Sequence, residues 1–238
     1  MSDSTRREFM QTAATLSLLA TAGLATAGLA TKVQAAEGAK MNTAFDYQHA
    51  PVALPFDTKS LKGISEKLIQ SHWENNYSGA VKALNVVRSR LTQALNDANT
   101  PPYIYNELKR EQLIRTGSVV LHEFYFANLG GDGKASAELR TKLAASFGSF
   151  DVWETEFRKI GQGLGGGSGW VVLGYNQKLK LLENYWLADH ATAPADTTPI
   201  LVLDMYEHAY QIDYAAAAEK YIDAFFTNIN WDVVAKRL

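Results

Sequence analysis

The segment Pro199-Ile200-Leu201-Val202-Leu203-Asp204-Met205-Tyr206-Glu207-His208 joins two sequence patterns. Its first five residues have the length and composition of a buried strand, whereas residues from Glu207 to Phe226 have the apolar spacing of a helix. Asp204 and His208 lie four positions apart at this junction, so one helical turn would bring both side chains to the same face. Metal ligands use this spacing. An ordinary aspartate at the start of a helix, with a histidine nearby, is the alternative interpretation.

Two more histidines lie on predicted helices in the first half of the chain. Apolar residues recur every three or four positions from Ser60 to Asp97, and a second helical pattern runs from Tyr103 to Asn128. The loop Asn99-Thr100-Pro101-Pro102 separates the two helices, which predicts a hairpin. His72 on the first helix and His122 on the second could therefore converge on one point. For each, a buried histidine with a structural role is the alternative.

The second half of the chain predicts further helices and a small sheet. Two helical patterns are followed by a glycine-rich stretch and then by three runs of strand composition, with a hairpin turn at Tyr175-Asn176-Gln177, and two further helical patterns end the chain. The predicted helices cover residues 135–147, 150–160, 207–226 and 231–238, and the predicted strands cover residues 170–174, 178–186 and 199–203.

These patterns predict an α+β fold behind an N-terminal leader. Residues 36–132 would form an extended arm, in which Pro51 and Pro55 prevent a long helix, followed by the helical hairpin domain. Residues 133–238 would form an α/β domain with a three-stranded antiparallel sheet.

Residues 1–35 have the features of an export signal. Arg6 and Arg7 precede a segment from Met10 to Thr31 that has no charged residue, and Val33-Gln34-Ala35 supplies small residues for cleavage near Ala36. We interpret it as a twin-arginine signal peptide, which predicts a periplasmic or extracellular protein and the twin-arginine export machinery as a partner. An uncleaved membrane anchor is the alternative, because the uncharged segment is long enough to cross a bilayer.

Composition excludes several kinds of site. The 238 residues contain no cysteine, so thiol nucleophiles, cysteine-ligated metals and disulfides are excluded. Lys and Arg number 23 against 25 Asp and Glu, a net charge of -2, and we therefore expect no nucleic-acid partner. The glycine-rich stretch lacks the Lys-Ser/Thr pair of a P-loop, and Gly167-Ser168-Gly169 lacks the spacing of a serine nucleophile elbow. No role is predicted for His49.

Together, His72, His122, Asp204 and His208 offer three imidazoles and one carboxylate, a donor set that suits manganese or iron better than magnesium or calcium. The segment Asp-Met-Tyr-Glu-His-Ala-Tyr-Gln-Ile-Asp-Tyr at 204–214 closely resembles the D-x-W-E-H-A-Y-x-x-D-Y signature of iron/manganese superoxide dismutases. The resemblance continues at residues 53–56, 122–126, 167–170 and 230–238. It implies one manganese or iron ion per chain, held by these four residues, and conversion of superoxide to dioxygen and hydrogen peroxide.

The resemblance also implies roles for the residues around the ligands. His190 corresponds to a side chain that tunes the metal's reduction potential through a hydrogen bond, with an exposed loop histidine as the alternative. A further group is expected to surround the ligands: Tyr125, Phe126, Trp170 and Tyr206.

A homodimer is implied by Glu207, which in the family reaches a ligand histidine of the partner subunit. Asn76 and Gln211 are candidates for an amide pair at the same interface. A carboxylate that simply favours the start of a helix is the alternative for Glu207.

The chain departs from the family near the substrate channel. The tyrosine that guards the channel is replaced by Ala80, with Tyr77, one turn earlier, as the candidate catalytic substitute, and the arginine expected after Asp213-Tyr214 is missing. A superoxide dismutase is therefore the first interpretation. The alternative is a metal-binding relative with weak or no dismutase activity.

Overall fold

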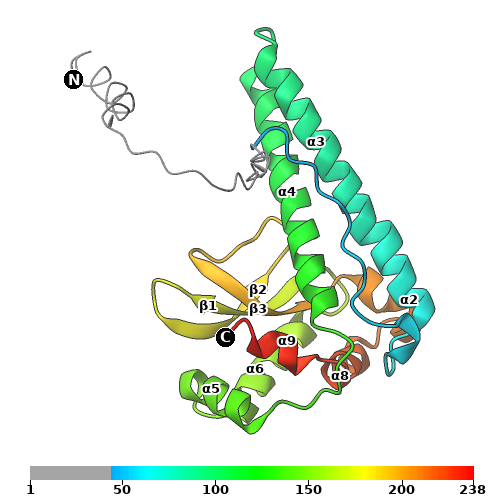
Figure 1. The fold of residues 1–238 in the computed structure, drawn as a ribbon, viewed down its shortest axis with the longest axis vertical. Coiled ribbons are helices and arrows are strands. Elements are labelled where there is room, and N and C mark those ends of the chain that lie inside the picture. Colours follow the sequence, from blue (N-terminus) through cyan, green and yellow to red (C-terminus); the bar gives the residue numbers. More distant parts are fainter. Residues whose placement is uncertain (1–43) are drawn as a thin grey trace, which may run out of the picture. The chain divides into compact units, whose positions relative to one another are not determined.

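The computed structural model describes residues 44–238 (Figure 1). The predicted export signal and the first residues of the predicted arm lie outside the described residues, and those that are described all belong to one compact unit. None of the helices in this part of the chain combines the length and apolar character needed to span a bilayer.

The N-terminal half is the predicted helical hairpin, but its first helix is divided. α2 (Glu66–Ser71) continues through a π-helical turn, η2 (His72–Tyr77), into α3 (Ser78–Asn96). The helix begins at Glu66 and not at Ser60 as predicted, because Gly63 adopts a positive φ of 76° and Ser65 caps the first turn by accepting the amide N–H of Leu68.

The second helix of the hairpin, α4 (Pro102–Ala127), packs along α3 (Figure 1). A proline at its first position is favourable there, because that residue needs no amide N–H partner. The boundary predicted between residues 132 and 133 falls in the loop that follows α4, and the division into two domains stays a prediction.

The sheet is antiparallel and three-stranded, as predicted, with β1 (Trp170–Asn176) between β2 (Leu181–Leu187) and β3 (Thr197–Asp204). The turn between β1 and β2 lies at residues 177–180, later than predicted, because the side chain of Asn176 accepts the amide N–H groups of Lys178 and Leu179. In this register Trp170, at the start of β1, is opposite Asp204, at the end of β3.

The helices of the second half cover the sheet. α5 (Ala137–Phe147) and α6 (Phe150–Leu164) pack on β2, and α6 also packs on β1 while α4 packs on β3. Residues 170–173 and 200–203 are all buried, without the alternation of a half-exposed strand. Both faces of the sheet are therefore covered, and the core lies between them.

The continuous helix predicted from Glu207 to Phe226 is wrong. The chain forms a 3-10 turn, η3 (Glu207–Ala209), then α7 (Gln211–Tyr214), α8 (Ala218–Thr227) and finally α9 (Trp231–Ala235). Two backbone conformations break the helix: Tyr210 has a φ of -146°, and Ala215 has a positive φ of 47°. Tertiary hydrogen bonds hold the intervening turn, since Asp213 accepts the amide N–H of Ser65.

Candidate metal centre

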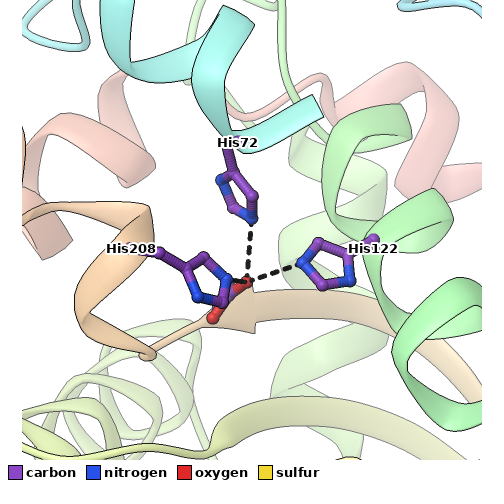
Figure 2. A group of neighbouring side chains, drawn as sticks. His72, His122 and His208 are labelled. Atoms are coloured by element: carbon purple, nitrogen blue, oxygen red, sulfur yellow. Dashed lines mark hydrogen bonds and ion pairs between the residues drawn. The ribbon is translucent and has the colours of Figure 1, made fainter. Parts of the chain in front are cut away.

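Four side chains from four separate segments meet at one point (Figure 2). His72 begins the π turn η2, His122 lies on α4, Asp204 ends β3, and His208 lies in η3. Their potential ligand atoms are all within 4.8 Å of one another, and this is the one such group among residues 44–238. His72, His122 and Asp204 are buried and His208 is half-buried. The structure thus brings together all four of the ligands predicted from the sequence.

The two oxygens of Asp204 have different tasks. Oδ1 accepts the amide N–H of Tyr206 at 2.8 Å, which fixes the carboxylate at the end of the strand. Oδ2 faces the three imidazoles and lies 3.1 Å from Nε2 of His72, 3.5 Å from Nε2 of His122 and 3.2 Å from Nε2 of His208. Figure 2 shows the three rings pointing to this oxygen from three directions. The arrangement leaves one carboxylate oxygen free to share a cation with three nitrogens.

The tautomer of His122 shows that the site fits a cation. Nδ1–H of His122 donates to the backbone carbonyl of Ser118 at 2.6 Å. Because burial keeps this ring neutral, with a single proton, Nε2 carries none. This Nε2 is buried, has no hydrogen-bond partner, and faces Oδ2 of Asp204, which is also an acceptor. Two lone pairs thus point at each other, and a metal ion between them would satisfy both.

Burial and charge set the protonation of the ligands. Burial lowers the pKa of His122 to about 3 and also lowers the pKa of His72, so both rings are neutral near pH 7. Burial alone would raise the pKa of Asp204, but its interactions with His208, together with its hydrogen bond to His72, outweigh burial and hold that pKa below its usual range. Two neutral imidazoles and one carboxylate, with His208 as the third imidazole, form a donor set that suits iron or manganese.

Aromatic rings surround the ligands, as predicted. Tyr125 and Phe126 both lie against His72, Trp170 lies against His122, and Tyr206 stacks on His208, with centroid separations of 5.2, 5.0, 5.0 and 5.3 Å respectively. Tyr221 adds a contact to the backbone of a ligand residue, because its hydroxyl donates to the carbonyl of Asp204 at 2.8 Å. These rings keep bulk water away from the buried ligands.

His190 lies beside the centre and is half-buried. Its Nδ1 accepts the indole N–H of Trp170 at 3.0 Å, and its ring is stacked on Tyr206 at 4.5 Å and is 5.9 Å from the ring of His122. Burial lowers the pKa of His190. The neutral ring therefore carries its single proton on Nε2 and can act as a hydrogen-bond donor.

The remaining predicted residues are placed around the edge of the centre. Tyr77 is buried, with its ring 6.3 Å from that of His122. Glu207 and Gln211 are exposed and Asn76 is half-buried, and no hydrogen bond joins Asn76 to Gln211 within the described part of the chain. The roles predicted for these residues in a dimer stay predictions.

Besides Tyr221, three residues near the centre were not predicted from the sequence. Ser118, one turn before His122, supplies the carbonyl that fixes the tautomer. Glu123 is a charged residue inside an apolar helical segment, a signal that could have drawn attention to it. Gly117 was visible only as a glycine inside a helix. A Cβ atom built on it would lie 1.7 Å from the carbonyl oxygen of His190, so glycine is what allows the His190 loop to approach α4.

Comparisons with known proteins show which chains this sequence is similar to. Residues 135–237 match the family model described as iron/manganese superoxide dismutases, C-terminal domain. A protein named superoxide dismutase [Fe] from Cupriavidus metallidurans is 50% identical over 177 residues, which cover 74% of this chain and 89% of the relative. One of the same name from Aquifex pyrophilus is 36% identical over 75% of this chain and 86% of its own length. A superoxide dismutase [Mn] from Mycobacterium intracellulare is 33% identical over 73% and 84%.

Replacing Gly117 by alanine should displace His190. The added methyl group cannot fit against the carbonyl of His190, so the loop must withdraw and the hydrogen bond from the indole of Trp170 to His190 should lengthen. We expect the Nε1–H resonance of Trp170 to shift in NMR spectra and its exchange with solvent to accelerate.

The control is Gly163→Ala in α6, where no atom lies within 4 Å of the added Cβ. It should leave the resonance in place and stabilise the protein by about 0.5–1 kcal/mol. Identical Trp170 spectra for both variants would contradict the packing argument.

Proposed function

This chain belongs to the iron/manganese superoxide dismutase family, and we propose that it performs the family's reaction as an exported homodimer whose ion is held by His72, His122, Asp204 and His208. The reaction converts superoxide to dioxygen and hydrogen peroxide at one iron or manganese ion per chain. The observation that carries the ligand assignment is the convergence of three imidazole Nε2 atoms on one buried carboxylate oxygen.

When bound, the ion supplies one-electron chemistry, in which it accepts an electron from one superoxide and gives an electron to the next. The chain's residues hold it in a site with a formal ligand charge of one negative unit. A single carboxylate leaves a small net charge in either oxidation state of the ion, so neither state is strongly disfavoured by the ligands. The rings around the ligands exclude bulk water, which strengthens these electrostatic interactions.

Formation of hydrogen peroxide consumes two protons, and His190 is the residue beside the centre with a defined donor. Trp170 occupies its Nδ1, so the proton resides on Nε2. We assign to this N–H the tuning hydrogen bond that the sequence comparison implies. Gly117 supports this role indirectly, because it lets the His190 loop lie close to the helix that carries His122.

The proposed dimer is supported by the residues that flank His208. Glu207 is exposed on η3 directly beside that ligand, and Ile212, 47% exposed, adds apolar surface on α7. The carboxylate of Glu207 can therefore reach a second copy of the chain.

Sedimentation equilibrium should give twice the mass of one chain, and Glu207→Ala should weaken association at least tenfold. Gln70→Ala, an exposed change on α2, is the control. A parent protein that sediments as a single chain would contradict the dimer.

Export is proposed from the leader sequence, in which Arg6 and Arg7 precede an uncharged segment. Changing both arginines to lysine should cause the protein to accumulate in the cytoplasm of a host that has the twin-arginine machinery, because the pair is what that machinery reads. Cell fractionation followed by immunoblotting measures the distribution. Lys32→Gln, in the same leader, should be exported normally. Export of the double-lysine variant at the parental level would rule out this route.

The dismutase function is tested by His122→Ala. Loss of this imidazole leaves an incomplete ligand set, so the variant should hold less than a tenth of the parental iron or manganese and show no superoxide removal above that of the free metal. Leu139→Ala, a buried change in α5 that does not touch the centre, controls for lost stability and should keep both metal and activity.

The same assay separates the two interpretations of the altered channel. Ala80 is 5% exposed on α3 in the place where the family has its channel tyrosine. If metal-loaded parent protein removes superoxide no faster than free metal does, the chain is a metal-binding relative and the proposed activity is wrong.

A further inference from the structure

A second polar cluster lies next to the metal centre, formed by Glu123, Tyr77 and His49. We propose that Glu123 is a positioning residue for the metal centre: it ties the π turn that begins with His72 to the helix that carries His122, and the N-terminal arm holds it in place. The proposal rests on the assignment of these two histidines as ligands. The resemblance to the family, from which the other roles were predicted, assigned no role to Glu123 or to His49.

One carboxylate oxygen makes the connection. Oε1 of Glu123 accepts the hydroxyl proton of Tyr77 at 2.7 Å and a hydrogen bond from Nε2 of His49 at 2.6 Å. Tyr77 is 1% exposed, and Glu123 is the acceptor for its hydroxyl proton within the described part of the chain.

The two ends of this connection adjoin metal ligands. Glu123 directly follows His122 on α4, and Tyr77 is the last residue of the π turn whose first residue is His72. Phe126, on the same helix as Glu123, contacts the π turn: its ring centroid lies 5.9 Å from that of Tyr77 and 5.0 Å from that of His72. A change in the separation of Glu123 and Tyr77 must therefore be accommodated between the two helices that present the ligands.

The N-terminal arm keeps the cluster from relaxing. The amide N–H of His49 donates to Oδ1 of Asn85, and Nδ2 of Asn85 donates back to the carbonyl of His49, both at 2.9 Å. Further along, the amide N–H of Val52 donates to the hydroxyl of Tyr77 at 2.8 Å, and the indole of Trp73 donates to the carbonyl of Val52 at 2.9 Å. The arm is thus fixed to both α3 and η2.

Loss of the carboxylate would act mainly on His72. The buried hydroxyl of Tyr77 would lose its acceptor, which is costly, so the side chain or its backbone must move. A π turn is an irregular segment that tertiary contacts maintain, and it is the part of this helix that can most easily return to regular α geometry. Such a change would rotate His72 away from Asp204. A simple structural brace, in contrast, would lower stability and leave the bound ion unchanged.

The experiment uses the iron-loaded full chain and two readouts besides activity: the EPR spectrum of the ferric ion and the rate of iron loss to an excess of chelator. For Glu123→Ala we expect an altered ferric spectrum and iron release about 10–100-fold faster, the range seen when a group that orients a ligand is removed. Glu123→Gln keeps an oxygen that accepts from Tyr77, so its spectrum should match the parent and its release rate should lie within about threefold of it, if the hydrogen bond is what matters.

The matched control is Glu111→Ala on the same helix, where the carboxylate pairs at the surface with Arg115 at 3.2 Å. It should change neither readout. If Glu123→Ala does not fold, Tyr77→Phe removes the same hydrogen bond with the loss of one oxygen atom and should alter both readouts in the same direction.

The proposal is overturned if Glu123→Ala, or Tyr77→Phe in its place, keeps the parental ferric spectrum and release rate and shows only a lower unfolding midpoint. It is also overturned if Glu123→Gln behaves like Glu123→Ala. Failure of the dismutase function is a separate result, because it would be seen as an inactive iron-loaded parent, whereas the spectrum and the release rate need only that His72 and His122 hold the ion.

Discussion

A buried carboxylate that faces three imidazole nitrogens is the constraint on which this structure depends. Asp204 is fully buried, and an ionised carboxylate in such a place is costly unless its charge is compensated. Neutral His72 and His122 cannot supply a full positive charge, since burial lowers both of their pKa values. A cation held by Oδ2 and the three Nε2 atoms would provide the compensation. The two helices of the hairpin, the end of β3 and the turn after it are held together at this point (Figure 2).

Irregular backbone lies beside three of the four proposed ligands. His72 begins a π turn, and Asp204 and His208 stand on either side of the change from strand to 3-10 turn. The regular parts of the fold, α4 and the buried sheet, instead fix the position of the site as a whole. This division is expected where ligand direction must be set more finely than a regular helix or strand allows.

The fold class could be predicted from the sequence because it depends on local patterns, such as the apolar spacing of the hairpin that carries His72 and His122. Local patterns left alternatives open for each of the four candidate ligands, and the resemblance of residues 204–214 to the family signature is what selected them as a set. The breaks at Tyr210 and Ala215 could not be predicted in this way, because residues 207–226 have the apolar spacing of one helix. The break is stabilised by contacts made far away in the sequence, such as the hydrogen bond from Ser65 to Asp213. Glu123 and Gly117 were missed for the same reason, since their partners His49 and His190 lie 74 and 73 positions away.

One short stretch of α4 organises the centre from three sides. Ser118 fixes the tautomer of His122, Gly117 admits the loop of His190, and Glu123 joins the helix to Tyr77 and the N-terminal arm. Residues 118 and 122 are one turn apart and share a helix face, whereas Gly117 and Glu123, each adjacent in sequence to one of them, lie on either side of that face. The hydroxyl of Tyr77 is already bonded to Glu123, so its ring lies beside His122 while its polar group is directed into the cluster with His49. In the proposed mechanism, therefore, Tyr77 is bound into the support of the ligands, and His190 is the residue that supplies the hydrogen bond at the centre.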